Sequence, residues 1–158
     1  MSQSKRYRIV DPIREKATTL TPEEGIRQTL IKFMIRDLEY PAHLFAVEKT
    51  LHSLNVSSKG VPPDMAKKRI DLLVFSPEGD FLRPLILGEC KAHKLNKKAL
   101  LQIISYNTYI KAPVIILCNG TDILMGVLNP QKRTFVFRSG LPTFHNLLKI
   151  RDSYAVLR

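Results

Sequence analysis

Apolar residues gather along the chain in short runs bounded by Gly, Pro, Asn or Asp, a pattern typical of strands and their turns. Residues 69–75 (RIDLLVF) and 84–91 (PLILGECK) are two such runs, and the SPEGD segment at 76–80 between them predicts a turn. We therefore expect these two strands to form an antiparallel hairpin. The other strands that the pattern predicts cover residues 44–52, 113–118, 123–128 and 134–138.

A second spacing, with apolar residues every three or four positions, predicts helices. One helix begins after Thr21, because Thr is a favoured N-cap, Pro22 suits the first helical position and Glu24 completes a capping box. It ends before Pro41, since a residue that precedes proline avoids the α region. The other predicted helices cover residues 96–110 and 142–150. The order is helix, three strands, helix and further strands, which predicts an α/β fold.

The chain has 158 residues, the size of one domain, and is long enough to bury a core without disulfide or metal staples. Basic and apolar residues alternate over residues 1–20, which we expect to form an N-terminal arm or a loosely packed lead-in. Residues 21–158 are expected to form a single domain. Within it, the Ser, Gly and Pro residues of 56–63 predict a loop.

Charge and cysteine content narrow the classes of partner and compartment. Lys and Arg number 25 against 14 Asp and Glu, a net charge of +11, which favours a polyanion such as DNA or RNA without establishing one. No apolar run approaches the roughly 20 residues of a membrane span, and the basic N-terminus is unlike a signal peptide. Two cysteines, Cys90 and Cys118, are too few for a disulfide framework or a cysteine-rich zinc site. We expect a cytoplasmic protein with no membrane partner.

The predicted hairpin places three charged residues at one end of an otherwise apolar sheet. Asp71 lies near the start of its strand and Glu89 near the end of the next, so antiparallel pairing brings them together, with Cβ atoms about 5 Å apart for direct neighbours. Lys91 projects from the same face as Glu89. Such acids suit Mg²⁺, which polarises a phosphoryl oxygen and activates water, while a lysine stabilises developing charge. The alternative is a structural salt bridge between Lys91 and the two acids.

Four more side chains are candidates for the same site, each with an ordinary structural alternative. Glu48 either adds a third carboxylate or faces solvent from an amphipathic strand. Glu24 either points at a metal or serves only the capping box. Gln102 and Tyr106 share one helix face and contact either the site or solvent. Cys90, between Glu89 and Lys91, is expected to face the core.

Several segments, taken in order, resemble the N-terminal nuclease domain of type I restriction enzyme R subunits, which belongs to the PD-(D/E)XK nuclease superfamily. The segments that carry this resemblance are RIDLLVF, LILGECKA, QIISYN and APVIILCNG. Two others, RYRIVDPIR and LTPEEGIRQ, resemble small stand-alone proteins of the same family. The similarity extends from about residue 6 to residue 120.

The resemblance implies a restriction-endonuclease-like core, a central mixed β-sheet flanked by helices in the order α-β-β-β-α-β. The residue pattern gives the same order and adds a C-terminal β-hairpin and helix. It also implies cleavage of DNA phosphodiester bonds that depends on Mg²⁺, with Mn²⁺ as a substitute. Asp71 and Glu89 would be the metal-binding acids, joined by Glu48 and Glu24, and Lys91 would be the catalytic lysine. Gln102 and Tyr106 match the helix motif beside the site.

Two departures from the family limit what the resemblance implies. Members often have Pro after the ECKA run, whereas this chain has His93. Type I R subunits also carry an ATP-driven translocase, for which 158 residues leave no room and of which no Walker-type motif is seen. We therefore expect either a stand-alone nuclease or one that acts with partners.

Two other functions remain open from the sequence. One is a non-catalytic module that binds nucleic acid through exposed basic residues, which would make binding strongly salt-dependent. The residues expected to contact phosphates in either case are Lys67, Lys68, Arg69, Lys94, Lys97 and Lys98. The other is an assembly subunit in which residues 2–16 pair with a second copy, as a homodimer, or with a partner protein.

Overall fold

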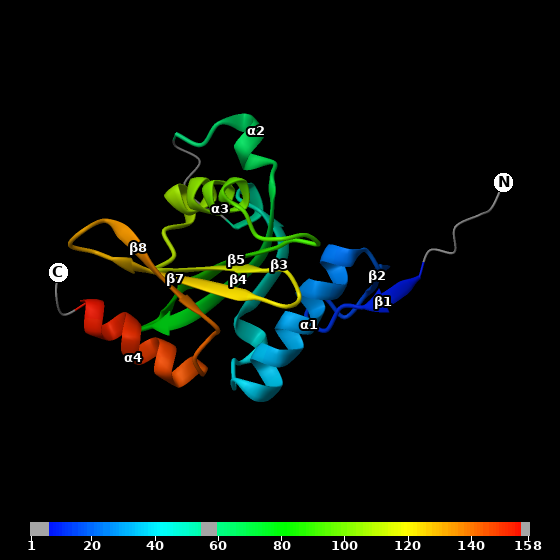
Figure 1. Cartoon of the computed structure of the whole chain (residues 1–158), viewed down its shortest axis with the longest axis horizontal. Helices are drawn as coiled ribbons and strands as arrows, with labels where there is room; N and C mark the ends of the chain where they lie inside the picture. Colours follow the sequence, from blue (N-terminus) through cyan, green and yellow to red (C-terminus); the bar gives the residue numbers. More distant parts are fainter. Residues whose placement is uncertain (1–6, 55–59, 156–158) are drawn as a thin grey trace.

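The computed structural model describes residues 7–54 and 60–155, whose main feature is a six-stranded mixed β-sheet with helices on both faces (Figure 1). The strand order is β3-β4-β5-β6-β7-β8, and neighbours are antiparallel except for the parallel pair β5–β6. The strands are β3 (Phe45–Thr50), β4 (Arg69–Glu78), β5 (Phe81–Cys90), β6 (Val114–Cys118), β7 (Ile123–Asn129) and β8 (Thr134–Ser139). The predicted α/β class and the predicted strands are therefore confirmed.

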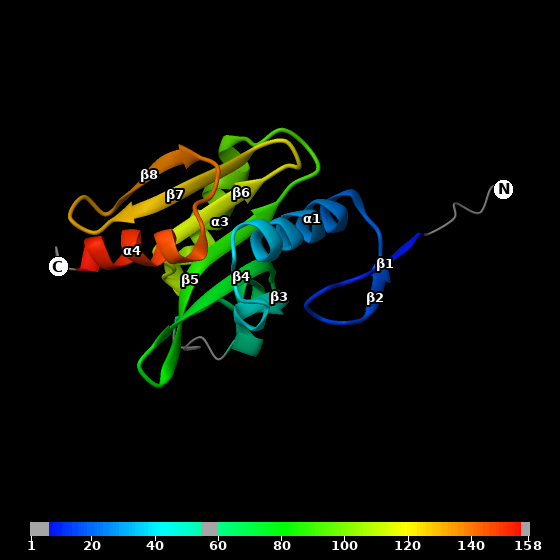
Figure 2. The ribbon, with the colours of Figure 1, turned by 90° about the horizontal axis from the view of Figure 1, so that it is seen from below.

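Helices cover the two faces of the sheet unequally. The α-helices within the described residues are α1 (Pro22–Asp37), α2 (Pro63–Ala66), α3 (Lys97–Ile110) and α4 (Phe144–Ala155). Two short 3-10 helices, η1 (Ala42–Leu44) and η2 (His52–Leu54), flank β3. Helices α1 and α4 lie across one face, and α3 with the short α2 lies on the other (Figures 1 and 2). None of these helices is long and apolar enough to cross a membrane.

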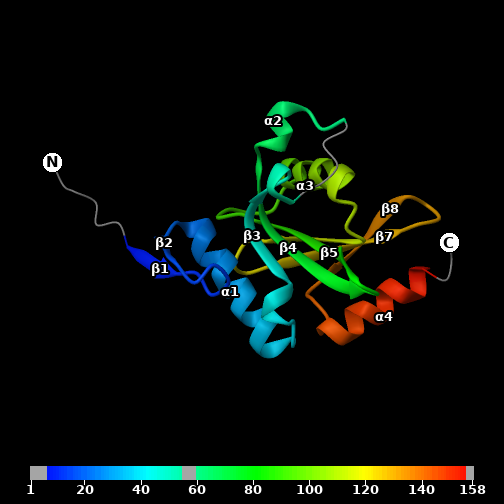
Figure 3. The same cartoon turned by 180° about the vertical axis from the view of Figure 1, so that it is seen from behind.

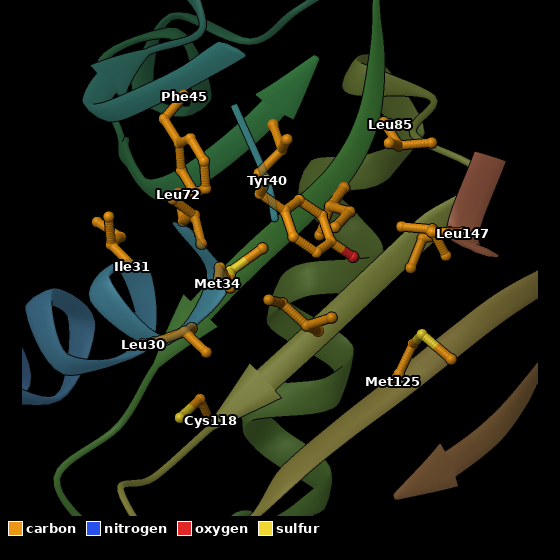
Figure 4. Packing of buried hydrophobic residues seen from close by; sticks show 14 of the residues in the cluster. Leu30, Ile31, Met34, Tyr40, Phe45, Leu72, Leu85, Cys118, Met125 and Leu147 are labelled. Carbon is orange, nitrogen blue, oxygen red and sulfur yellow. The ribbon is translucent and has the colours of Figure 1, made fainter. Parts of the chain in front are cut away.

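Two apolar cores follow from this layering. Leu72 and Val74 of β4 face α1 and pack in one core with Leu30 and Met34 (Figure 4). Leu73, between them in sequence, faces the opposite way and packs with the α3 side chains. Because side chains alternate along a strand, a central strand buried on both faces needs a continuous apolar run, as the sequence of β4 has.

Side-chain caps fix the two helices that later contribute to the site. The Thr21 hydroxyl accepts a hydrogen bond from the backbone N–H of Glu24 at 3.1 Å, so α1 begins where the sequence predicted. The Asn96 side chain accepts from the backbone N–H of Ala99 at 2.9 Å and starts α3. Each cap fixes the residue at which its helix begins.

Two element boundaries differ clearly from the predictions. The turn expected over 76–80 is shorter, because β4 continues through Pro77 to Glu78. Proline is tolerated there, since β3 pairs with β4 only as far as Val74 and leaves one side of β4 open. The last helix begins at Phe144 and runs to Ala155, beyond the predicted end at 150. Of the predicted loop at 56–63, residues 56–59 lie outside the described residues.

The N-terminal segment is more ordered than a loose lead-in over the residues described. Strands β1 (Arg8–Val10) and β2 (Ala17–Thr19) form an antiparallel ribbon beside the start of α1 (Figure 3). Asp11 in the connecting turn is fully buried and accepts hydrogen bonds from the backbone N–H groups of Ile13 and Arg14 and from the Arg14 side chain. Burial raises the pKa of Asp11, but these hydrogen bonds together outweigh it and the net pKa is lowered.

Candidate functional site

Strands β4 and β5 bring Asp71 and Glu89 together at one end of the sheet. Leu72 pairs with Gly88, so Asp71 and Glu89 occupy the next positions of the two antiparallel strands. The Asp71 carboxylate accepts a 2.8 Å hydrogen bond from the backbone N–H of Cys90. Glu89 is only 6% exposed. The predicted convergence of these two acids is present in the structure.

Lys91 and helix α3 close this cluster on one side. The Lys91 ammonium donates to Glu89 at 2.7 Å and to the Gln102 side-chain oxygen at 3.2 Å. The Gln102 amide in turn donates to Glu89 at 2.9 Å and to the Tyr106 hydroxyl at 3.3 Å. Gln102 and Tyr106, four residues apart on α3, therefore contact the acid cluster, as one of the two sequence interpretations expected.

Arg27 of α1 lies on the other side of the cluster, and the sequence analysis did not single it out. Its guanidinium donates to Glu24, to Glu48 at 2.5 Å and to Asp71 at 3.4 Å. The side chain is 4% exposed. One buried cation thus joins carboxylates from α1, β3 and β4. The position of Arg27, three residues after Glu24 on a helix face, is the only sequence signal that could have pointed to it.

Glu24 forms only one half of the predicted capping box. Its backbone N–H donates to the Thr21 hydroxyl that caps α1, whereas its carboxylate turns inward and accepts from Gln28 at 2.7 Å, from Arg14 at 3.4 Å and from Arg27. Arg14 belongs to the N-terminal segment, so residues 7–20 contribute a side chain to the wall of the site. The capping box therefore accounts for the hydrogen bond of the Glu24 backbone N–H but not for the contacts of its carboxylate.

Glu48 reaches the cluster from an irregularity in β3. Its φ of 54° lies in the left-handed region, and the strand pairing passes over it from Val47–Leu72 to Lys49–Ile70. A non-glycine residue in this conformation costs about 1–3 kcal/mol, so the surroundings must hold it. Its carboxylate accepts from Arg27 and, at 3.3 Å, from Arg69. Glu48 therefore joins the cluster rather than facing solvent alone.

Burial and crowding of negative charge shift the protonation of the central acids. Burial, and next the charge of Asp71, raise the pKa of Glu89 to about 7. Burial also raises the pKa of Asp71, against the opposing effects of the Cys90 N–H and Arg27. For Lys91, burial lowers the pKa, but the hydrogen bond and charge of Glu89 outweigh it, so the net pKa is raised and the ammonium stays charged.

The donor chemistry of the Asp71–Glu89 pair fits a hard divalent cation. Both side chains offer carboxylate oxygens, and Mg²⁺ is commonly held by one or two carboxylates with water and phosphate oxygens completing its shell. Across residues 7–54 and 60–155, Glu89 Oε2 accepts no hydrogen bond, whereas Oε1 accepts two. No three acidic, His or Cys side chains of those residues are arranged to share one ion. Glu24 and Glu48 are instead paired with Arg27, so the four predicted acids divide into two pairs.

Exposed basic residues flank the site. The start of β4 and the end of β5 lie at the same end of the sheet, so the runs that precede β4 and follow β5 border Asp71 and Glu89. The exposed residues in these runs are Lys67, Lys68, Arg69, Lys94, Lys97 and Lys98. Lys98 is four residues before Gln102, on the same stripe of α3. These exposed basic residues therefore form a basic rim on two sides of a buried acidic centre.

Two other residues near the cluster contribute no side chain to it. Cys90 is 2% exposed and packs in the core beneath α1, as the alternation along β5 predicts. Burial raises the pKa of its thiol, which makes it a poor nucleophile. His93 is exposed in the segment after β5.

Comparison with known proteins identifies the family. A family model described as type I restriction enzyme R protein N terminus (HSDR_N) matches residues 22–142. That match includes every residue of the Asp71–Glu89–Lys91 and Arg27–Glu24–Glu48 groups. No curated protein matches the chain significantly, and no solved structure does. Since the model covers well over half of the chain, the chain belongs to the family of type I restriction enzyme R protein N-termini.

Proposed function

We propose that this protein is a metal-dependent deoxyribonuclease with a PD-(D/E)XK core that cleaves phosphodiester bonds. The observation that carries the proposal is the buried Asp71–Glu89–Lys91 cluster at the end of two central strands. Apart from the short α2 and the two 3-10 helices around β3, the order α1-β3-β4-β5-α3-β6 agrees with the core expected from the resemblance. Buried like charges are costly unless a partner offsets them, and a hard cation between Asp71 and Glu89 is such a partner.

In this proposal Asp71 and Glu89 hold Mg²⁺ through their carboxylate oxygens. When bound there, the cation supplies polarisation of the phosphoryl group and a water of lowered pKa. The Cys90 N–H fixes the orientation of Asp71. Lys91 remains protonated and donates to the charge that develops on the phosphate or orients the attacking water. Gln102 holds Lys91 in place, and Tyr106 holds Gln102.

DNA is the substrate that the surface charge favours. The basic rim before β4 and after β5 offers phosphate contacts on two sides of the cluster, and the chain carries a net charge of +11. Each phosphate contact releases counterions, so binding should weaken steeply as salt is raised. A second copy or a partner protein would provide whatever recognition of a specific sequence the domain itself lacks.

One observation favours a second candidate, a nucleic-acid-binding module without catalysis. Arg27 pairs with Glu24, Glu48 and Asp71 together, which is also what a purely structural ion network would do. Such a module would bind DNA through the same basic rim. Mg²⁺ would leave its stability unchanged and would affect DNA binding only by competing for the phosphates, as added salt does.

A cleavage assay separates the two candidates. Supercoiled, linear and single-stranded DNA would be incubated with the protein and Mg²⁺ or Mn²⁺, alongside Glu89→Gln and the matched control Glu78→Gln. Glu78 lies at the opposite end of the same hairpin and is 65% exposed. We expect cleavage by the wild type and the control, and a loss of about 100-fold or more in Glu89→Gln. The proposal fails if the wild type cleaves none of these DNA forms, or if Glu89→Gln cleaves as the wild type does.

A further inference from the structure

Arg27 is a buried cation at the centre of the site to which the proposed chemistry gives no role. Its side chain is 4% exposed, and within the described residues its Nε–H has no hydrogen-bond partner. The two terminal nitrogens divide three carboxylates between them: Nη2 contacts Glu24, and Nη1 contacts Glu48 and Asp71. A guanidinium is well suited to this, because it is planar, always charged and carries several donors in fixed directions.

The three contacts are unequal, and the weakest is the one to the proposed metal ligand. Arg27 approaches Glu48 to 2.5 Å but Asp71 only to 3.4 Å. Asp71 has a second anchor, because its other oxygen accepts from the Cys90 N–H at 2.8 Å. If Arg27 gave up Asp71, it would keep two closer carboxylate partners, and Asp71 would keep its orientation.

Glu24 and Glu48 are both held toward Arg27. Glu24 is additionally gripped by Gln28 at 2.7 Å and by Arg14 at 3.4 Å. Glu48 sits in the left-handed backbone conformation that the surrounding contacts must maintain. The carboxylates of these two acids are therefore fixed acceptors for the guanidinium and are separate from the Asp71–Glu89 pair.

We infer that Arg27 is a positioning residue that holds the site as a built-in substitute for a divalent cation. In the metal-free protein it neutralises Asp71 and keeps the acids together, and an incoming cation displaces it from Asp71 alone. Glu24 and Glu48 then keep their hydrogen bonds to Arg27 and do not bind the metal. The inference rests on the proposed function, since it takes Asp71 and Glu89 as the metal ligands.

Two consequences follow from this exchange. Without Arg27, uncompensated carboxylates would crowd a buried site, so the metal-free protein should lose stability strongly. A divalent cation would then meet no competing positive charge at Asp71 and should bind more tightly. A ligand that binds only the folded state raises the melting temperature, and does so more when it binds more tightly. An ion network unconnected with metal binding would show the first consequence but not the second.

The test compares Arg27→Met and Arg27→Lys with the wild type and with the control Arg83→Met, which removes an arginine that is 62% exposed at the far end of the hairpin. Melting temperatures are measured in EDTA and in MnCl₂, and Mn²⁺ affinity is measured by calorimetry. In EDTA we expect Arg27→Met to melt roughly 10 °C below the wild type, and Arg83→Met within about 2 °C of it. In MnCl₂ the Arg27→Met deficit should shrink, with Mn²⁺ bound about tenfold more tightly than by the wild type.

Arg27→Lys keeps the charge but cannot span the three carboxylates, so its Mn²⁺ affinity should fall between those of Arg27→Met and the wild type. It also provides the readout if Arg27→Met does not fold in EDTA. If the wild type and Arg27→Lys bind Mn²⁺ and neither Arg27 variant binds it more tightly than the wild type, the inference is overturned while the proposed function stands. If the wild type and Arg27→Lys both bind no Mn²⁺, the metal site itself is absent and both proposals fall.

Discussion

An ion pair lies near each end of the β4–β5 hairpin, and the two pairs differ in their N–O distance and in the exposure of their side chains. At the site end, Glu89 and Lys91 lie 2.7 Å apart with exposed fractions of 7% and 31%. At the turn end, Glu78 and Arg83 lie 3.6 Å apart, both more than 60% exposed. The turn end also borders a cleft of about 650 Å³ lined in part by Ser76, Lys111 and Arg151.

The difference shows that neither charge nor concavity alone indicates the site. An exposed ion pair contributes about 0–1 kcal/mol and is common on protein surfaces. Burying an ion pair costs several kcal/mol per ion unless hydrogen bonds and further charges offset it. The site end therefore needs the supporting contacts from Arg27 and Gln102, and that concentration of buried, mutually supported charge points to function.

The largest expected difference between the two ends is in catalysis. Lys91→Met should reduce DNA cleavage by about 100-fold or more, because under the proposed function it removes the charge that would face the phosphate, whereas Arg83→Met should stay within about twofold. Mn²⁺ binding should persist in Lys91→Met, since the lysine acts on water or phosphate rather than on the ion. Single-turnover cleavage and calorimetry measure the two effects. Equal rates of DNA cleavage by Lys91→Met and Arg83→Met would contradict the placement of the active site at the Glu89–Lys91 end of the hairpin.

Two glycines of the hairpin provide a comparison of packing. A Cβ at Gly88 would lie 3.1 Å from an Ile116 side-chain carbon and 3.2 Å from Leu72, both buried, so Gly88→Ala should destabilise by about 1–3 kcal/mol. Gly79 has open space around it but a φ of +59°, and alanine there should cost about 1 kcal/mol through backbone strain alone.

Urea unfolding measures both costs, and cleavage assays separate their consequences. Because Gly88 precedes Glu89, Gly88→Ala should also slow cleavage, whereas Gly79→Ala should leave it unchanged. A Gly88→Ala variant with wild-type stability and rate would contradict the close packing described for β5.

The ends should also differ in their response to pH. The pKa of Glu89 is raised from 4.5 to about 7, so the folded protein holds a proton that the unfolded chain has lost in this interval. The stabilising contribution of this proton is therefore complete below about pH 4.5 and is lost as the pH rises through 7. In EDTA, denaturation between about pH 5 and pH 8 should show a decline in the wild type and a flatter profile in Glu89→Gln. If the stability of the wild type and of Glu89→Gln changed with pH in the same way, this would count against a raised pKa of Glu89.

The smallest effect is expected at the turn end. Glu78→Gln breaks the exposed pair with Arg83 and should change the free energy of unfolding by less than about 1 kcal/mol, with the difference vanishing in high salt. Urea denaturation at low and high salt measures it. A larger, salt-resistant loss would mean that the turn end is more than a solvated surface.

The sequence was sufficient to predict those parts of the site that depend on regular periodicity. A period of two and antiparallel pairing place Asp71 beside Glu89 and Lys91 on the same face as Glu89. Helical spacing places Gln102 and Tyr106 together, and the Thr21 cap locates the start of α1. These inferences need only the local geometry of one strand pair and one helix.

The rest depends on contacts that no local pattern encodes. Arg27 is long enough to reach either solvent or core, and only the packing of α1 on the sheet directs it toward Asp71. The irregular backbone of Glu48 has no signal in a strand of ordinary residues. Strands of three residues, such as β1 and β2, are too short for periodicity, so the contribution of Arg14 was missed as well.

Whether the Asp71–Glu89 pair binds a metal ion can be seen in a crystal structure of the wild-type protein grown with Mn²⁺. We expect anomalous density between the carboxylates of Asp71 and Glu89, with Arg27 moved away from Asp71 but still in contact with Glu24 and Glu48. A structure without anomalous density at this position, in which Arg27 keeps all three carboxylates, would contradict the metal site and leave the cluster a structural ion network.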